Sequence, residues 1–359
     1  MDKIAIGLSG GVDSAVAAWL LLQDGHEVVA FTMRLPVFSG GVETAQADTL
    51  DDARRVAECL RVPLAELDLR DAFGRDVLTP FADAYADGLT PNPCALCNRA
   101  IKFGALADAA RRAGCDALAT GHYAQTQFTG GRWQLLCAAD PNQDQSYFLH
   151  RLSQEQISFA RFPIGHLAKA EVRALADAAG LPVSRKRGSR DLCFLPGGDY
   201  REFLRARCPG ACQPGPVRHA LTNEILGTHP GTASCTIGQR KGLGIATGEP
   251  FYAVELQPAT RTVFAGPREM LSQDAFCVRE VNWISIPRPN APTRVMARTR
   301  YRQKLFAARV EPLDGDAWRV VPDAPQDKAA PGQSAVFYDG AVVMGGGIVA
   351  QKIMSCDGK

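Results

Sequence analysis

The stretch Gly7-Leu8-Ser9-Gly10-Gly11-Val12-Asp13-Ser14 decides the fold of the first part of the chain, because it follows an apolar, strand-like run and opens a helix-like segment. Its two adjacent glycines let backbone N–H groups turn toward a ligand, which residues with a Cβ do less easily. The helix N-terminus adds unpaired donors and a partial positive charge, and the two serines add hydroxyl groups. The stretch therefore predicts a loop that binds a polyphosphate.

Asp13 is the unusual member of this loop. A carboxylate beside phosphates needs a cation between them, and we expect Mg²⁺ in that place. The loop differs from a Walker A sequence, in which Lys and then Ser or Thr follow the last glycine. A strand-to-helix turn capped by Asp or Ser is the simpler interpretation, but the complete octapeptide in this position favours phosphate binding.

Strand-like and helix-like segments alternate up to about residue 195, which predicts an α/β fold with a parallel sheet covered on both faces. The expected strands are 3–8, 27–33, 63–69 and 116–120, and the expected helices are 14–23, 48–60 and 103–113. The Gly-rich, polar stretch 39–47 predicts a mobile loop.

Turn signals such as Pro-Gly and Asp-Gly separate short alternating runs in the second part of the chain. This spacing predicts small β domains of the barrel type. We expect three domains: residues 1–198 with the phosphate loop, a small central domain at 199–272, and a C-terminal β-barrel at 273–359.

The composition is that of a folded protein, with 359 residues and 46% hydrophobic side chains. Forty Lys and Arg against 38 Asp and Glu give a net charge of +2, which neither demands nor excludes a nucleic-acid partner. No apolar run is long enough to predict a membrane span, and the N-terminus lacks the pattern of a signal peptide. We therefore expect a cytoplasmic protein, in which eleven cysteines indicate thiol chemistry or metal binding for some and burial for the rest.

The segment from Thr90 to Phe103 has the features of a reactive thiol site. Its prolines fix an extended lead-in, after which Cys97 is expected at the start of a helix that begins around Asn98. A helix N-terminus and nearby basic side chains, here Arg99 and Lys102, lower the pKa of a thiol.

A second cysteine segment, 189–196, carries Cys193 just after the basic run 185–190. These cations favour a thiolate or persulfide anion, or they hold RNA phosphate. Burial as small apolar side chains is the expectation for Cys59, Cys115, Cys137, Cys235 and Cys277, while Cys208 and Cys212 could also pair or bind metal.

With both cysteine segments, the chain resembles the tRNA 2-thiouridylase family (tRNA-uridine 2-sulfurtransferases). The octapeptide resembles the pyrophosphatase loop of the ATP pyrophosphatase superfamily, which also includes GMP synthetase, NAD synthetase and argininosuccinate synthase. Segments that resemble the 2-thiouridylases occur in the family's order at 92–103, 119–124, 144–149, 236–244, 300–303 and 345–348.

The resemblance implies a domain with the adenine nucleotide alpha hydrolase-like ATP pyrophosphatase fold, a small central domain and a C-terminal β-barrel. By position, ATP is held by Gly7, Leu8, Ser9, Gly10, Gly11, Val12, Asp13, Ser14, Met33 and Gly121. The target base lies beside Asn92, Pro93 and Cys94. The residues that contact tRNA are His122, Gln143, Asp144, Gln145, Arg300, Tyr301 and Gln333.

The chemistry implied by the resemblance is adenylation of the C2 oxygen of the wobble uridine, followed by sulfur transfer. Cys193 receives sulfur as a persulfide, and Cys97 is the nucleophile paired with it, with Asp13 at the ATP phosphates. The implied partners are tRNAs of the Lys, Glu and Gln type and a sulfur donor, either a cysteine desulfurase or a sulfur relay protein. A monomer is expected for the free protein, with no membrane partner.

Two departures from the family pattern leave alternatives open. Cys94 stands where the family has Asp, and Gln143 stands where it has Lys. Cys94, Cys97 and Cys193 together could hold a 4Fe–4S cluster with one iron open to sulfide, as in related RNA-thiolating enzymes, or, with a missing fourth ligand, zinc. Another ATP pyrophosphatase synthetase and a non-catalytic RNA-binding protein are the rival interpretations.

The basic residues near position 300 also allow two interpretations. Arg298, Arg300, Arg302 and Lys304 have period-two spacing, which places them on one side of a strand. Such a row is either the solvated face of a strand or a surface that grips RNA phosphates.

Overall fold

A five-stranded parallel sheet with strand order β5-β2-β1-β6-β9 is the centre of the N-terminal part of the computed structural model, which describes residues 1–44, 46–186, 192–246 and 248–351. Its strands are β1 (Lys3–Gly7), β2 (Glu27–Arg34), β5 (Leu64–Asp68), β6 (Ala117–Thr120) and β9 (Ala160–Arg161). The apolar residues of β1 are buried on both faces, which is why its sequence does not alternate. The predicted parallel sheet is confirmed.

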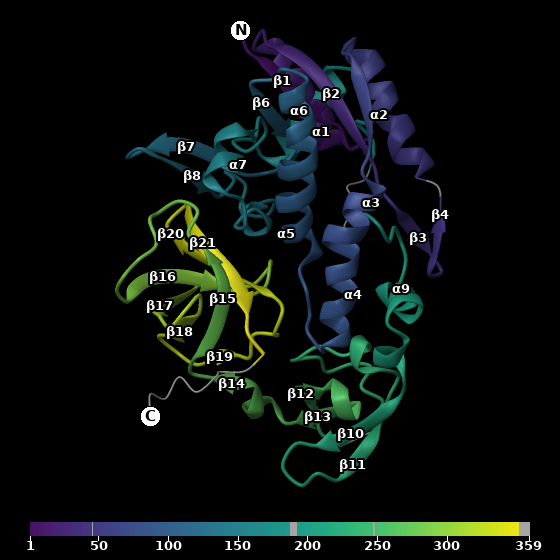
Figure 1. Ribbon diagram of the computed structural model, residues 1–359, viewed down its shortest axis with the longest axis vertical. Helices are drawn as coiled ribbons and strands as arrows, with labels where there is room; N and C mark the ends of the chain where they lie inside the picture. The colour runs from purple at the N-terminus through teal and green to yellow at the C-terminus, as the bar shows by residue number, and fades with distance from the viewer. Residues whose placement is uncertain (45, 187–191, 247, 352–359) are drawn as a thin grey trace.

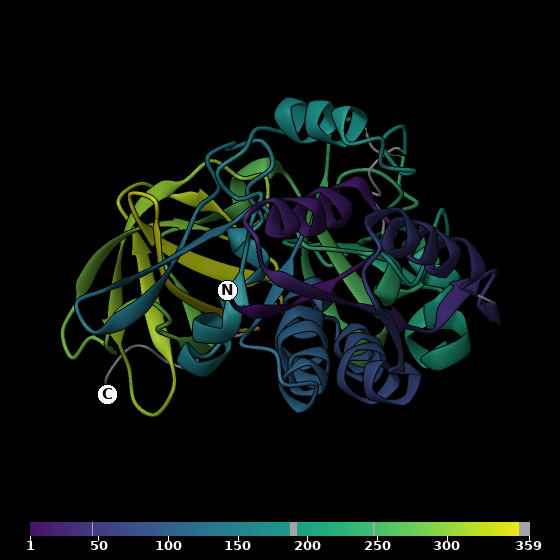
Figure 2. The same ribbon diagram turned by 90° about the horizontal axis from the view of Figure 1, so that it is seen from above.

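Helices cover both faces of this sheet (Figure 2). One face packs against α1 (Val12–Gln23), α2 (Ala47–Leu60) and α8 (Lys169–Ala178). The other packs against α7 (Gln154–Phe159) and a continuous helix made of α5 (Pro93–Cys97), the π-helical η2 (Asn98–Leu106) and α6 (Ala107–Arg112). A second continuous helix joins α3 (Arg70–Phe73), η1 (Gly74–Leu78) and α4 (Thr79–Ala86).

The helix that carries the first cysteine segment begins earlier than expected. It starts at Pro93, where the fixed φ of proline suits the first helical position. The side chain of Asn92 caps it by accepting a hydrogen bond from the Ala95 N–H at 3.3 Å. The expected start at Asn98 is wrong, so Cys94 occupies the first turn and Cys97 lies further along the helix.

The Gly-rich stretch after β2 forms a hairpin, β3 (Val37–Ser39) with β4 (Val42–Thr44), where an irregular loop was expected. Gly40 and Gly41 both have positive φ, which a two-residue hairpin turn requires. The Phe38 N–H donates to the Phe194 carbonyl oxygen at 2.8 Å, so the hairpin supports the segment that carries Cys193.

Two further β structures follow, as predicted (Figure 1). The central sheet has the order β11-β10-β13-β12, from β10 (Gly215–His219), β11 (Ile225–His229), β12 (Tyr252–Gln257) and β13 (Thr262–Gly266). The C-terminal barrel comprises β15 (Phe276–Asn282), β16 (Thr293–Arg298), β17 (Phe306–Pro312), β18 (Trp318–Pro322), β20 (Ser334–Asp339) and β21 (Val342–Val349). Pairing of β15 with β21 closes it.

The N-terminal part also contributes to the barrel sheet. The hairpin β7 (Gln125–Thr129) and β8 (Arg132–Leu136) pairs with β21, with Val342 opposite Leu136. The remaining short elements are α9 (Tyr200–Arg207), η3 (Ser146–Phe148), η4 (Pro209–Cys212), η5 (Thr232–Ser234), η6 (Pro258–Thr260), η7 (Arg268–Leu271), β14 (Ser272–Gln273) and β19 (Gln326–Asp327). In the described ranges no helix is long and apolar enough to cross a membrane.

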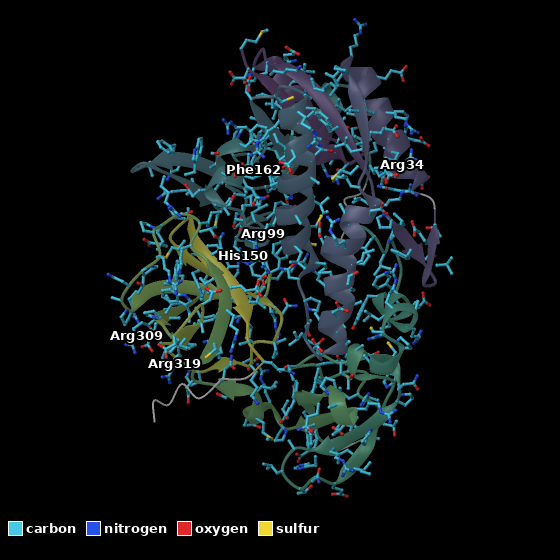
Figure 3. The ribbon with its side chains drawn as sticks, viewed as in Figure 1. Arg34, Arg99, His150, Phe162, Arg309 and Arg319 are labelled. Carbon is cyan, nitrogen blue, oxygen red and sulfur yellow. The ribbon has the colours of Figure 1, made fainter. Side chains whose placement is uncertain are left out.

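The junction between the N-terminal part and the barrel is tightly packed. His150, labelled in Figure 3, is fully buried there, and the Asn282 amide donates to its carbonyl oxygen at 2.7 Å. A Cβ on Gly346 would lie 2.8 Å from the His150 ring, so only glycine allows this approach. The two parts therefore act as one scaffold around the surface between them.

Arg298 and Asp144 form an ion pair across this junction. Arg298 Nη2 lies 2.8 Å from Asp144 Oδ2, and both side chains are largely buried. Arg298 is the last residue of β16, and the chain then turns, so the expected one-sided row of basic residues up to Lys304 is wrong.

Removing one partner of this ion pair is expected to loosen the junction. Arg298→Met leaves the Asp144 carboxylate without its counter-ion, at a cost of about 3 kcal/mol. Arg294→Met, on the same strand but in an exposed pair with Asp323, should cost less than about 1 kcal/mol. Urea-unfolding midpoints of the two variants and the parent provide the comparison. Equal midpoints for the two variants would contradict the assigned role of Arg298.

Candidate active site

The phosphate loop joins the central strand β1 to the N-terminus of α1. Gly11 is the N-cap, and among the described residues no side chain caps the helix, so its N–H groups face outward for a ligand. The Ser9 N–H donates to Ser14 Oγ at 3.2 Å, and Ser14 Oγ donates to the Gly11 carbonyl oxygen at 3.1 Å. These bonds fix the turn in the shape of an anion cradle.

Glycine is required where other segments approach this loop. Gly10 has a φ of 67°, and a Cβ there would lie 2.5 Å from the Thr49 carbonyl oxygen of α2. At the end of β6, a Cβ on Gly121 would lie 2.5 Å from the Ser14 backbone nitrogen. Gly121 therefore brings the strand end against the loop.

The Asp13 carboxylate is neutralised by a lysine of the chain. Lys169 Nζ, at the start of α8, lies 2.6 and 2.8 Å from its two oxygens, and the Tyr123 hydroxyl donates to Oδ1 at 2.9 Å. The sequence predicted that a cation accompanies Asp13, but in this structure the cation is an ammonium group. Lys169 and Tyr123 use only part of the acceptor capacity of the carboxylate, so Mg²⁺ binding by Asp13 stays a prediction.

A second lysine connects the phosphate loop with the chain that leads to Cys193. Lys186 Nζ donates to the Gly10 carbonyl oxygen at 3.1 Å and pairs with Asp52 of α2. Burial raises the pKa of Asp52, but hydrogen bonds from Lys186 and Arg55 outweigh it and hold the pKa below its usual value. The rest of the predicted basic run, 187–190, lies outside the described residues.

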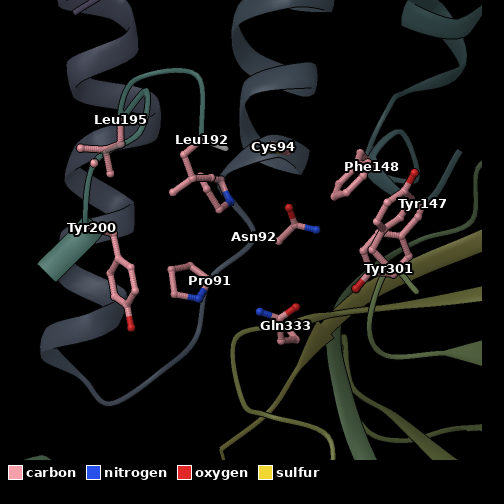
Figure 4. Close-up of a pocket in the computed structure, with 12 residues that line it drawn as sticks. Pro91, Asn92, Cys94, Tyr147, Phe148, Leu192, Leu195, Tyr200, Tyr301 and Gln333 are labelled. Atoms are coloured by element: carbon pink, nitrogen blue, oxygen red, sulfur yellow. The ribbon is translucent and has the colours of Figure 1, made fainter. Parts of the chain in front are cut away.

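A pocket of about 450 Å³ lies between the N-terminal part, the chain after Cys193 and the barrel. Figure 4 shows Tyr147, Phe148 and Tyr301 on one side of it and Leu192, Leu195 and Tyr200 on the other. The remaining lining residues are Pro91, Asn92, Pro93, Cys94, Gly198 and Gln333. The structure thus brings the three residues predicted at the target base into one pocket with Tyr301 and Gln333.

The walls of this pocket suit a flat ring with polar edges. Phe148 and Tyr301 have ring centroids 4.6 Å apart and leave apolar surface for stacking. Asn92 is held by its amide, which donates to Ser334 Oγ at 3.1 Å, and Gln333 donates to the Thr90 carbonyl oxygen at 2.9 Å. Barrel residues thereby fix the polar side chains on the N-terminal side.

Of the three predicted thiols Cys94 lines the pocket, and all three are free. Cys94 is exposed into the pocket, Cys193 follows the lining residue Leu192 and is also exposed, and Cys97 is buried. Burial raises the pKa of Cys97 to about 12, although the charge of Lys102 opposes it, and surrounding protein raises that of Cys94 to about 11. The expectation of a lowered pKa at Cys97 is wrong, because burial outweighs the nearby cation.

Different alkylation rates should follow from these environments. At pH 7.5 iodoacetamide is expected to modify Cys193 well before Cys97. The Cys97 thiol is buried, and with a pKa of about 12 it stays protonated at this pH. Modification of Cys97 should rise as the pH increases. Peptide mass spectrometry over a time course gives the rates, with exposed Cys59 and buried Cys235 as internal references. Faster labelling of Cys97 than of Cys193 would contradict the structure.

The residues predicted to contact tRNA do not form one surface. Arg300 is exposed and Tyr301 lines the pocket, whereas His122 and Asp144 are buried. Asp144 accepts hydrogen bonds from Ser146 and Arg298. In this structure Asp144 therefore holds the domain junction.

Several site residues escaped the sequence interpretation. Lys169, Tyr123 and Lys186 surround the phosphate loop, and Tyr200 closes the pocket. Their positions follow from packing between segments far apart in the chain. Only the Ser-Arg-Lys-Arg run gave a local signal for Lys186.

The fold and the site define a nucleotide-binding α/β protein. Its parallel sheet has a phosphate-type loop after the central strand, and a pocket lined by a cysteine lies between this part and the barrel. Residues 2–197 match the tRNA methyl transferase HUP domain, 201–267 the tRNA methyl transferase PRC-barrel domain, and 273–349 the aminomethyltransferase beta-barrel domain.

Full-length relatives identify the family. The tRNA-specific 2-thiouridylase MnmA of Moorella thermoacetica is 42% identical over 351 residues, covering 96% of this chain and 98% of the relative. The protein of the same name from Trichormus variabilis is 42% identical over 355 residues, covering 98% and 99%. The chain belongs to the tRNA-specific 2-thiouridylase family.

A distant structural likeness also occurs. The U34-tRNA thiolase NcsA from Methanococcus maripaludis, solved with its 4Fe–4S cluster, has a TM-score of 0.33 and 20% identity, covering 54% of this chain and 61% of that chain. A similarity at this level does not bear on the site.

Proposed function

We propose that this protein is a tRNA-uridine 2-sulfurtransferase, which uses ATP to convert the wobble uridine of tRNA to 2-thiouridine. The observation that carries the proposal is the pocket that combines an aromatic wall, Asn92, an exposed Cys94 and Leu192, the residue before Cys193. The full-length relatives named tRNA-specific 2-thiouridylase support the same substrate.

The phosphate loop is proposed to bind ATP. Backbone N–H groups at the start of α1 and the hydroxyls of Ser9 and Ser14 are suited to the phosphates, and Met33 and Gly121 to the adenosine. The uracil C2 oxygen attacks the α-phosphate, so the α–β bond breaks and pyrophosphate leaves. The adenylated oxygen can then depart as AMP, a far better leaving group than oxide.

Sulfur transfer is assigned to Cys193 and Cys97. A donor protein, either a cysteine desulfurase or a sulfur relay protein, leaves a persulfide on Cys193. Its terminal sulfur attacks C2 and AMP leaves; Cys97 then attacks Cys193 Sγ, forming a disulfide and freeing the thiocarbonyl. Alternatively, Cys97 first frees sulfide by the same disulfide, and the sulfide attacks C2. Both routes bring the two sulfurs to bonding distance, and a thiol reductant restores the dithiol.

Metal chemistry is the second candidate for the sulfur step. Within the described ranges no group of three Cys, His, Asp or Glu side chains is arranged to hold a metal ion. This finding concerns a single ion, so a 4Fe–4S cluster held by Cys94, Cys97 and Cys193 stays an alternative, and no step is derived through one. We expect Mg²⁺ to accompany the phosphates of ATP and to lie between them and the Asp13 carboxylate.

The remaining partners follow from the proposed reaction. The substrates would be tRNAs of the Lys, Glu and Gln type, for which Gln145, Arg300 and Tyr301 provide contacts. The reaction belongs in the cytoplasm, where tRNA and ATP are available. We propose a monomer for the free protein.

The decisive experiment is thiolation in vitro. Pure protein, analysed for iron, is incubated with ATP, Mg²⁺, a sulfide source and unmodified tRNA, and the nucleosides are analysed by mass spectrometry. 2-Thiouridine formed without iron supports the thiol route, whereas thiolation only after cluster reconstitution replaces it. ATP cleavage without thiolation would indicate another ATP pyrophosphatase, and neither activity would indicate an RNA-binding protein.

A further inference from the structure

Lys102 and His122 are in contact, and the proposed sulfur chemistry gives this contact no role. We call the pocket lined by Cys94 the cysteine pocket. Lys102 Nζ lies 3.1 Å from His122 Nε2, and His122 Nδ1 lies 2.7 Å from Thr120 Oγ1. An ammonium group only donates, so Nε2 accepts and the ring proton resides on Nδ1, which donates to Thr120. Burial and the charge of Lys102 hold the pKa of His122 well below its usual value, which keeps the ring neutral.

The Lys102 ammonium group lacks a carboxylate partner in the part of the chain that the structure describes. None of the ion pairs found there includes it, although the residue is partly buried on η2. A charge taken from water without a counter-ion is costly. This arrangement is expected where a ligand or reacting group supplies the negative charge.

Helix spacing places Lys102 one turn after Cys97 on the same continuous helix. Lys102 follows Cys97 by five residues, and the helix from Asn98 has the π-type pattern of i to i+5 hydrogen bonds, which places residues five apart over one another. Loss of solvation by the surrounding protein raises the pKa of Cys94, Cys97 and Cys193, and the charge of Lys102 lowers the pKa of all three. The backbone N–H groups of Cys193 and Phe194 also lower the pKa of Cys193.

We propose that Lys102 stabilises a sulfur anion, thiolate or persulfide, in the cysteine pocket, and that His122 is a positioning residue that holds the ammonium group there. The nature of the anion rests on the proposed function, but the electrostatic role does not. His122 thereby acts from behind the pocket, which agrees with its burial.

The test compares a neutral and an anionic reagent at Cys193. Iodoacetamide and iodoacetate both need the thiolate, so the ratio of their rates reports local charge and not exposure or thiolate fraction. Lys102→Met should lower the iodoacetate-to-iodoacetamide ratio on the order of five-fold, as expected for one unit charge at short range. Lys102→Arg should retain it. Lys3→Met is the control for loss of one lysine charge. Lys3 begins β1, whereas the phosphate loop follows the other end of this strand.

His122 variants separate positioning from charge. His122→Leu removes the acceptor and should lower the ratio, whereas His122→Gln offers a carbonyl oxygen and should restore most of it. An unchanged ratio in Lys102→Met overturns the proposal, and an unchanged ratio in His122→Leu overturns the role of His122. If the ratios change as expected but the parent protein thiolates no tRNA, the proposed function is wrong. The electrostatic role of Lys102 at the pocket is then still supported.

Discussion

Cys193→Ser is expected to lower 2-thiouridine formation on the order of 10⁶-fold, the size of effect seen when a nucleophile that forms a covalent intermediate is lost. The serine hydroxyl cannot carry a persulfide, so no sulfur reaches the activated base. ATP binding should persist, because the phosphate loop lies on β1 and α1, away from this residue. Nucleoside mass spectrometry measures the product, and the protein mass shows whether an extra sulfur atom is carried.

The matched control for Cys193 is Cys59→Ser. Cys59 is also exposed and free, and it lies on α2, outside the pocket. Cys59→Ser should thiolate like the parent protein. Cys97→Ser should retain the persulfide on Cys193 but fail to release product. Full thiolation by Cys193→Ser would overturn the assigned relay.

Gly121→Ala is expected to lower tRNA-dependent pyrophosphate release about 10²-fold, as misplacement by about 1 Å does in a catalytic site. The new Cβ would meet the Ser14 nitrogen at 2.5 Å, so either the loop or the end of β6 must move. The persulfide on Cys193 should still form. Pyrophosphate release and persulfide loading, measured on the same preparation, separate the two steps.

Gly74→Ala is the matched control for Gly121. Gly74 is helical, and a Cβ there meets no atom within 4 Å. Replacement by alanine should leave pyrophosphate release unchanged and stabilise the helix by about 0.5 to 1 kcal/mol. Equal activity of the two alanine variants would contradict the close approach at Gly121.

The alternation of strands and helices was sufficient to predict the parallel sheet, because buried parallel strands read as short apolar runs. The local sequence pattern gave wrong predictions where the backbone conformation depends on only a few residues. The helix start at Pro93 was missed because Asn92, the cap, was interpreted only as a contact to the base. The hairpin around Gly40 and Gly41 was missed because its strands are only three residues long.

The candidate site was predicted in part. The thiols and Asn92 were found from the sequence, and the structure gathers them around one pocket with Tyr301. Their roles there, and the domain boundaries at 198 and 272, stay predictions. The state of Cys97 could not be predicted, because burial depends on distant segments: Phe81 of α4 and Phe203 of α9 belong to the same core cluster.

The sequence by itself determined the phosphate loop, the order of the α/β and β parts, and the residues able to carry sulfur, because these depend on residue type and local spacing. Only the tertiary structure decided that Lys169 neutralises Asp13, that Tyr200 joins barrel residues in lining the pocket, and that Lys102 contacts His122. Charge pairing and burial act through space, so they arise only when strands and helices far apart in the chain are brought together.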